Sequence, residues 1–361
     1  MITSVYIHIP FCNNICTYCD FCKRYYSDEL ASKYLDGLKS EIEENYQNEI
    51  INTIYIGGGT PSSLSINNIK KLMRLIKIFN LSKNCEFTFE CNPESITKEK
   101  LLLLKQNGVN RISIGIESTN NRKLKYLGRC HDFLMVKEKV ELIKKTGINN
   151  INVDLIYALD KQTIKDIKKD LDGIISLDVN HISTYSLEIH NHTILGINKV
   201  LPVNEDIDSD MYTYICNYLK DMGYEHYEIS NFCKNKTYSR HNLVYWHNEK
   251  YYGFGLGASG YINNIRYTNT RSMINYLNKK RIIEKEIINK DDNISYELIL
   301  GFRLINGINK NDFKKKYGVD LINQYNIKEL IDKGYLIDDS ENIKINEDYL
   351  YIENSILENF V

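Results

Sequence analysis

Short apolar runs alternate along the first half of the chain with longer stretches in which apolar residues recur every three or four positions. The runs are rich in β-branched and aromatic residues, which is typical of buried strands, and the stretches between them have the period of helices that bury one face. Strands are predicted at 4–9, 52–56, 86–90, 111–115, 151–156 and 181–187. Helices are predicted at 31–46, 67–79, 98–108, 133–146 and 164–177.

This alternation predicts an α/β fold, because strands separated by helices usually pair in parallel and carry the helices on the outside. A partial (β/α)6 barrel is expected over residues 1–230, and a doubly wound sheet is the alternative. Residues 231–285 are polar and aromatic and are expected to connect two parts. Residues 286–361 predict short helices followed by a hairpin at "GYLIDDSENIKIN", which is typical of a winged-helix-like α+β appendage.

Composition and charge narrow the choice of partners. The 361 residues carry a net charge of −1, so no basic surface points to nucleic acid. The start of the chain lacks the pattern of a signal peptide, and no apolar run approaches the ~20 residues of a membrane helix. We therefore expect a cytoplasmic protein, and leave peripheral contact with a membrane open.

The stretch "PFCNNICTYCDFC" (10–22) concentrates four cysteines, Cys12, Cys16, Cys19 and Cys22. In a reducing compartment such a group indicates a metal site rather than disulfides. Four thiolates would suit zinc or an iron–sulfur cluster. A cubane held by the first three alone would leave one iron open to a small molecule. Spacing alone leaves zinc and iron both possible.

Further polar residues and glycines follow the ends of successive predicted strands. The cysteines follow the first strand and "GGGTPS" (57–62) follows the second, while Glu90, Glu117 and Asp154 lie at the ends of later strands. Because active groups of β/α barrels gather at the carboxyl ends of their strands, one cavity mouth can collect all of them.

The segment "YIHIPFCNNICTYCDF" (6–21) resembles the cluster loop of the radical S-adenosylmethionine (SAM) superfamily. The segments "FECNPE" (89–94), "NRISIGIES" (110–118), "LGRCH" (127–131) and "NVDLIYAL" (152–159) are similar to family segments in the same order. The resemblance implies that Cys12, Cys16 and Cys19 hold a [4Fe–4S] cluster whose open iron takes SAM. It also implies a set of residues around SAM: Tyr6, Tyr18, Gly58, Gly59, Thr60, Glu90, Glu117, Arg129 and Asp154. Relatives usually carry Gln at the position of Glu117, so the contact made there is left open.

Within that superfamily the whole chain is most similar to the oxygen-independent coproporphyrinogen III oxidase-like branch. The oxidases of the branch have a longer arm before the cluster and a fourth cysteine two residues after the third. Here eleven residues precede Cys12, and Phe21 stands at the fourth-cysteine position. Both features favour the bacterial haem chaperones of the branch.

The segment "HNLVYW" (241–246) resembles the motif associated with haem in those chaperones. A neutral histidine is a common haem ligand, and aromatic rings offer flat apolar surface to a porphyrin. The resemblance implies that His241 contacts haem, with His247 as an alternative; ordinary packing of the same residues is the other interpretation. The neighbouring "YYGFGLGASGY" (251–261) is either a close-packed turn or part of a pocket.

We therefore expect a haem chaperone with a [4Fe–4S] cluster, SAM and haem, which delivers haem to haem-requiring respiratory apo-proteins. A flavodoxin- or ferredoxin-like electron donor is the expected redox partner. The main alternative is the oxidase itself, which decarboxylates coproporphyrinogen III. Radical haem breakdown, methyl transfer and a zinc-stabilised binding module are further alternatives.

The cysteine spacing leads to a direct test. After anaerobic reconstitution, Cys22→Ser should keep the iron and sulfide content of the wild type, whereas Cys16→Ser should lose it, because only the first three cysteines are expected to ligate iron. Iron and sulfide analysis measures both. Equal loss in the two variants would indicate a four-cysteine site.

Overall fold

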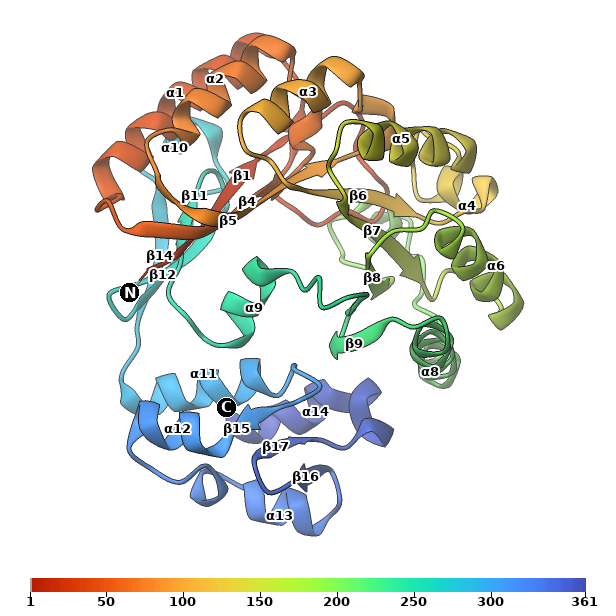
Figure 1. Ribbon diagram of the computed structural model, residues 1–361, viewed down its shortest axis with the longest axis vertical. Helices are drawn as coiled ribbons and strands as arrows, with labels where there is room; N and C mark the ends of the chain where they lie inside the picture. The colour runs from red at the N-terminus through yellow and green to blue at the C-terminus, as the bar shows by residue number, and fades with distance from the viewer. Residues whose placement is uncertain (1) are drawn as a thin grey trace.

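The main sheet of the computed structural model, which describes residues 2–361, has the strand order β11-β1-β4-β5-β6-β7-β8-β10-β9 (Figure 1). The middle of this order consists of neighbours that pair in parallel and follow one another along the chain. They are β1 (Ser4–Ile9), β4 (Ile50–Gly58), β5 (Asn80–Cys91), β6 (Arg111–Glu117), β7 (Asn150–Tyr157) and β8 (His181–Ser186). The predicted strands and their parallel pairing are confirmed.

Helices cover one face of this sheet, as Figure 1 shows. They are α1 (Asp28–Asn45), α2 (Ile66–Ile76), α3 (Lys98–Gln106), α4 (Asn121–Tyr126), α5 (Phe133–Lys145) and α6 (Ile164–Ile175). Each begins after a residue whose side-chain oxygen accepts a hydrogen bond from a backbone N–H of the first turn, which satisfies a donor that the helix leaves free. The N-cap residues are Ser27, Ser65, Thr97, Asn120, Asp132 and Thr163.

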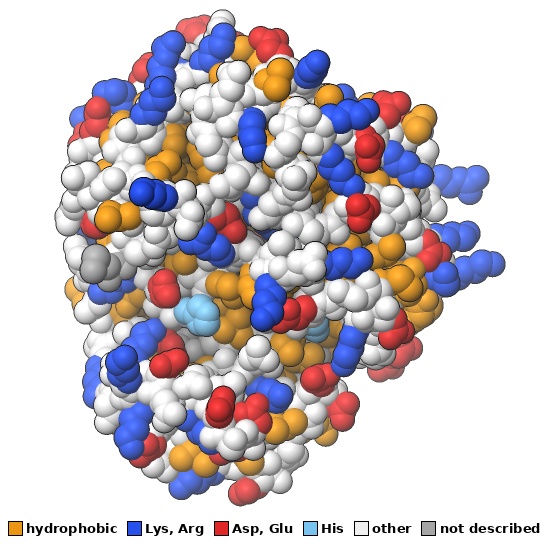
Figure 2. Space-filling view, viewed as in Figure 1, with side chains coloured by type: hydrophobic (Ala, Val, Ile, Leu, Met, Phe, Trp, Pro, Cys, Tyr) orange, Lys and Arg blue, Asp and Glu red, His pale blue; other side chains and the backbone are white. Residues whose placement is uncertain are grey.

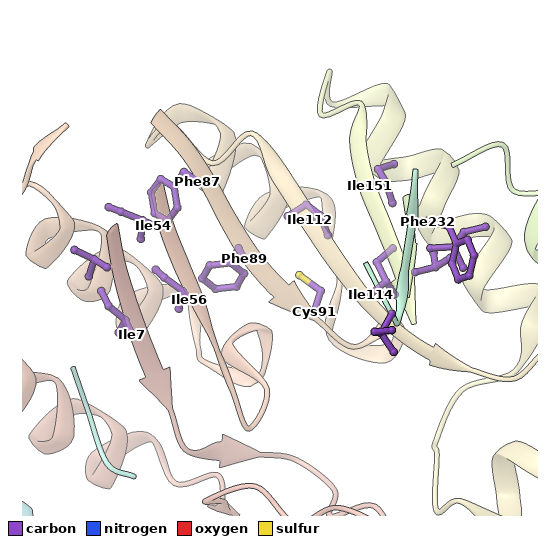
Figure 3. Close-up of a cluster of buried hydrophobic side chains, with 14 of the residues drawn as sticks. Ile7, Ile54, Ile56, Phe87, Phe89, Cys91, Ile112, Ile114, Ile151 and Phe232 are labelled. Atoms are coloured by element: carbon purple, nitrogen blue, oxygen red, sulfur yellow. The ribbon is translucent and has the colours of Figure 1, made fainter. Parts of the chain in front are cut away.

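The core lies between the sheet and these helices. Ile54, Phe87, Phe89, Ile112 and Ile114 are at most 1% exposed and lie along neighbouring strands in Figure 3. Removing such a side chain from water stabilises the fold by ~1.5–3 kcal/mol. Because the parallel strands are held in register by this core, their carboxyl ends finish at one edge of the sheet.

Strands from the predicted connecting segment extend the sheet at both ends. β11 (Tyr252–Phe254) pairs in parallel with β1, and β10 (Asn231–Cys233) pairs antiparallel with β8 and with β9 (Glu225–Glu228). β11 and β9 are the outer strands in the described residues, so the sheet is that of a partial barrel. The predicted fold class is thus confirmed, while the domain boundaries remain a prediction.

The glycine-rich stretch that includes β11 and the residues after it packs as a close turn. A β-carbon at Gly253 would lie 1.8 Å from the carbonyl oxygen of Ser259, so only glycine fits there. The turn leads into a small sheet of β12 (Ser259–Ile262), β13 (Ile265–Asn269) and β14 (Ile282–Ile287). Of the two interpretations of residues 251–261, the close-packed turn is the one that this geometry favours.

A buried carboxylate attaches that small sheet to the barrel. Glu41 of α1 accepts hydrogen bonds from the Gly255 N–H at 2.8 Å, the Asn269 amide at 2.6 Å and the Tyr276 hydroxyl of α10 (Met273–Leu277) at 2.5 Å. Burial raises the pKa of Glu41, and these donors oppose that rise.

The C-terminal part is a separate layer below the sheet in Figure 1. Its elements are α11 (Lys290–Gly301), β15 (Ile308–Asn309), α12 (Lys310–Tyr317), α13 (Ile327–Asp332), β16 (Leu336–Asp338) and β17 (Asn342–Ile345), with sheet order β15-β17-β16. The predicted hairpin is β16–β17, so the winged-helix-like appendage is confirmed. Backbone bonds join it to the barrel next to β9: the Ile305 N–H donates to the Tyr227 carbonyl at 3.2 Å.

Three helices lie between β8 and β11 along the chain, α7 (Ile194–Ile197), α8 (Glu205–Asp221) and α9 (Arg240–Trp246), and α14 (Glu353–Leu357) lies near the C-terminus. In Figure 1, α9 lies between the sheet and the C-terminal layer. Among residues 2–361, no helix has both the length and the apolar character needed to cross a membrane.

Candidate functional site

A cavity of about 490 Å³ lies at the carboxyl edge of the parallel strands. It collects nearly all the residues that the sequence predicted to act together. Those that line it are Cys12, Cys16, Tyr18, Cys19, Gly58, Gly59, Thr60, Glu90, Glu117, Arg129 and Asp154. The expectation that strand ends would bring distant segments to one mouth is therefore met for these residues.

The cavity wall contains the free cysteines Cys12, Cys16 and Cys19 of the cysteine loop, and Cys91 at the end of β5 also lines it. The Thr60 hydroxyl lies 3.6 Å from the Cys12 sulfur, and the Arg129 guanidinium donates to the Cys16 sulfur at 3.3 Å. Cys22 is buried outside the cavity lining, where burial raises the pKa of its thiol and the nearby Arg271 opposes that rise. Burial raises the pKa of the Cys12 thiol to about 11 and raises that of Cys19 as well, so metal binding at these thiols would release protons.

This donor set fits a cluster better than a single ion. Within residues 2–361, no three His, Cys, Asp or Glu side chains are close enough together to hold one metal ion. Three cysteine sulfurs that open onto one cavity are instead the donors that a cubane with an open iron requires.

Two glycines allow the cysteine loop to approach the strand end after β4. Gly58 has a φ of 111°, and a β-carbon there would lie 2.5 Å from the His8 ring. A β-carbon at Gly59 would lie 2.9 Å from the Phe11 nitrogen and 3.0 Å from the Cys12 sulfur. Any larger residue would push the loop away, which explains the glycine run.

Arg129 joins the cysteine loop to two strand ends. Its side chain is 5% exposed and donates to the Asn92 side-chain oxygen at 3.0 Å and to the Gly115 carbonyl. Its guanidinium also lies 3.6 Å from a Glu117 carboxylate oxygen. Burial raises the pKa of Glu117 despite this neighbouring cation, so burial outweighs the ion pair.

Two more carboxylates line the cavity. Glu90 accepts from the Tyr55 hydroxyl at 2.6 Å and from the Gly58 N–H at 3.0 Å, and Asp154 accepts from the Asn152 amide at 2.7 Å. Burial raises the pKa of Glu90 to about 7 and also raises that of Asp154. A positively charged ligand would lower the pKa of both carboxyls, because such a charge stabilises the ionised form.

The structure adds a buried arginine that sequence reasoning missed. Arg111 is 2% exposed, lines the cavity and acts on both Glu90 and Asp154 by lowering their pKa values against the effect of burial. The sequence did contain a signal for this residue, because Arg111 is a charged residue at the start of the otherwise apolar predicted strand 111–115. Other lining residues that were missed are Tyr55, Asn92, Ser113, Asn152, Ser183, Tyr185 and His190.

Two predicted site residues lie outside this lining. The Tyr6 hydroxyl is 3.0 Å from the His8 Nδ1 atom, beneath the glycine turn. His241, on α9, is 1% exposed; its Nδ1 atom is 2.7 Å from the Thr53 hydroxyl and its Nε2 atom 2.8 Å from the Tyr245 hydroxyl. Burial lowers the pKa of His241 to about 3, so the ring is neutral.

A second cavity of about 340 Å³ lies between α9 and the C-terminal layer. Trp246 and His247 line it, together with Glu225, Asp312 and Phe313. Figure 2 shows the hollow between the sheet and this layer, with hydrophobic side chains gathered in it. The helix α9 therefore contributes to both cavities, since Asn242 lines the first.

A cysteine-lined cavity at the carboxyl edge of the parallel strands is the arrangement of radical SAM proteins, and the comparisons agree. The model of the radical SAM superfamily matches residues 6–174, and that of the HemN C-terminal domain matches residues 288–348. Among solved structures, coproporphyrinogen III oxidase (HemN) from Escherichia coli superimposes with a TM-score of 0.87 at 20% identity. That likeness covers 99% of this chain and 90% of the other, and it shows the fold.

Several relatives that span nearly the whole chain are described as heme chaperone HemW. The protein of this name from Lactococcus lactis is 39% identical over 99% of this chain and 97% of its own. Those from Bacillus subtilis and Escherichia coli are 37% and 30% identical over 94% and 99% of this chain, and over 93% and 98% of their own. The chain belongs to the HemW family of the radical SAM superfamily.

The buried carboxylates give the ligand-free protein a predicted pH dependence. The pKa of Glu90 is about 7 in the folded chain against an ordinary 4.5, so its contribution to the free energy of unfolding is full below pH 4.5 and is lost as the pH rises to about 7. Relative to Glu90→Gln, the wild type should lose up to ~3 kcal/mol over that range.

Urea unfolding at the two ends of the range measures this difference. Glu99→Gln, an exposed change on α3, is the matched control and should follow the wild type. Parallel pH profiles for wild type and Glu90→Gln would show that the Glu90 carboxyl is not perturbed by burial.

Proposed function

We propose that this protein is a haem chaperone that carries a [4Fe–4S] cluster and SAM, binds haem and delivers it to haem-requiring respiratory apo-proteins. The observation that carries the proposal concerns the four cysteines of the cysteine loop: Cys12, Cys16 and Cys19 line the cavity, whereas Cys22 lies in the core. Phe21, at the position of the oxidases' fourth cysteine, is 67% exposed. The description shared by the full-length relatives supports the same function.

In this proposal Cys12, Cys16 and Cys19 ligate the cluster, whose open iron supplies a site for the amino and carboxylate groups of SAM. Five carboxylates and three cationic groups line the cavity: Asp20, Glu90, Glu117, Asp154 and Glu188 against Lys23, Arg111 and Arg129. The excess of carboxylates suits the sulfonium and ammonium charges of SAM, and Arg129 suits its carboxylate. The same cavity is lined by Tyr18, Gly58, Gly59 and Thr60. Tyr6 lies outside the lining and contacts His8.

His241 enters the proposal as a positioning residue for haem binding. Its ring joins α9 to β4 through Thr53, and its backbone N–H donates to the Glu86 carboxylate at 3.0 Å. Because both ring nitrogens are engaged, His241 acts on haem through the placement of α9. The partners proposed are haem, apo-proteins that accept it, and a flavodoxin- or ferredoxin-like electron donor.

Asp154→Ala should weaken SAM binding, because it removes a buried carboxylate from the proposed ammonium and ribose contacts. Losing one charge-assisted hydrogen bond should cost ~1.5–3 kcal/mol, roughly ten- to a hundredfold in affinity. Calorimetric titration of the reconstituted protein with SAM measures it, with the exposed Asp178→Ala as control. Unchanged affinity in Asp154→Ala would remove this residue from the site.

His241→Ala and Thr53→Val should have the same effect on haem if His241 acts by position. Both should lower haem occupancy and leave the Soret band of the bound fraction, and the iron–sulfur content, as in the wild type. A shifted Soret band in His241→Ala alone would instead indicate that this histidine ligates iron.

The chaperone and the decarboxylase differ in their products. Reconstituted protein with SAM and reductant should bind haem and leave coproporphyrinogen III unchanged under strictly anaerobic conditions. Chromatography of the tetrapyrroles measures the outcome. Formation of protoporphyrinogen IX would overturn the chaperone proposal and restore the oxidase.

A further inference from the structure

The chain has eight histidines, and most of them are not available to a ligand. His8, His131, His181 and His241 are buried, and His226 stacks on Phe232 with a ring separation of 4.3 Å. The side chains of His190 and His192 are 40% and 59% exposed, and His247 is also exposed. Any histidine that binds haem iron without rearrangement of the fold is therefore one of these three.

His190 lies at the mouth of the cysteine cavity and lines it. Its Nε2 atom is 3.2 Å from a Glu188 carboxylate oxygen and 3.9 Å from an oxygen of Asp20. The same Asp20 carboxylate is hydrogen-bonded to Nε2 of His192. In the described residues, the Nδ1 atom of His190 has no hydrogen-bond partner.

This arrangement resembles that of histidines that ligate a metal ion. Histidines that ligate metals usually donate their other ring N–H to a carboxylate, which fixes the ring and increases its basicity. Here the carboxylates of Glu188 and Asp20 lie beside one ring nitrogen of His190, and the other nitrogen has no hydrogen-bond partner in the described residues. His247 has no side-chain hydrogen bond in the described residues.

The loop that carries His190 is attached at both ends. The Leu187 N–H donates to the Tyr157 carbonyl at 3.0 Å, and the Leu195 N–H donates to the Thr17 carbonyl of the cysteine loop at 3.0 Å. Leu187 and Leu195 are both buried in a small cluster beside Tyr18. The loop is thus fixed against the segment that bears the cysteines.

An apolar rim accompanies this histidine. Phe21 and Tyr185 line the same cavity and are 67% and 43% exposed. Exposed aromatic side chains at the mouth of a cavity are what the apolar faces of a tetrapyrrole require.

We propose that His190 is the axial ligand of haem iron, and that haem is held at the mouth of the cysteine cavity against Phe21 and Tyr185. The inference rests on the proposed haem function, and it adds which residue ligates the iron and where haem binds. The imidazole keeps its proton toward Glu188 and Asp20 and gives the lone pair of its other nitrogen to iron. The bound haem would close the cavity over the cluster and SAM.

The test is titration of the anaerobically reconstituted, SAM-loaded protein with ferric haem. The readouts are the haem dissociation constant, the magnetic circular dichroism of the haem iron and the iron–sulfur content. His190→Ala is the test variant, and His192→Ala and His247→Ala are matched controls. His190→Ala should weaken binding by about tenfold or more, as loss of a metal-supporting group commonly does.

Its spectrum should also lose the signature of histidine ligation and regain it when free imidazole is added, with the iron–sulfur content unchanged. The controls should keep the wild-type signature. Retention of that signature by His190→Ala, or its loss in His247→Ala or His192→Ala instead, would overturn the inference while leaving the haem function standing. Absence of haem binding by the wild type would be the separate failure of the proposed function.

Discussion

The site depends on the contacts that the buried guanidinium of Arg129 makes with its acceptors. An arginine that is 5% exposed must be surrounded by acceptors, since an unpaired buried charge is strongly destabilising. Its acceptors come from separate segments: the Cys16 sulfur in the cysteine loop, the Asn92 side chain after β5, and the Gly115 carbonyl and Glu117 at the end of β6. Satisfying one side chain therefore fixes the cysteine loop over the strand ends.

The charge of the cavity follows from the same constraint. The two positive charges of Arg129 and Arg111 do not neutralise the three carboxylates of Glu90, Glu117 and Asp154. Burial raises the pKa values of all three carboxyls. The ligand-free site is thus held in a state that a cation would stabilise. This physical preference agrees with SAM, whereas the open, apolar rim beside it suits a flat hydrophobic ligand. A charged ligand and a flat apolar ligand can therefore bind in the same cavity, because the charged residues and the exposed aromatic residues lie in different parts of it.

Much of this arrangement could be predicted from local pattern. The apolar runs and the helical stretches between them identified six of the seven parallel strands of the main sheet, because buried parallel strands have little alternation and their ends carry the functional residues. Cys12, Gly59, Glu90 and Asp154 were predicted to meet and do line one cavity. The unpredicted parts depend on pairings distant in sequence: β11 pairs with β1, and His241 is enclosed by Thr53. Arg111 was missed because its role appears only when Glu90 and Asp154 surround it.

Transfer of haem tests the central claim most directly. Haem-loaded, SAM-loaded protein is mixed anaerobically with a haem-free b-type cytochrome, and the Soret bands, the cluster absorbance and SAM are followed together. The account predicts that the acceptor gains haem while the cluster and SAM remain intact. Haem that stays with this protein, or release of 5′-deoxyadenosine together with a changed tetrapyrrole, would contradict it.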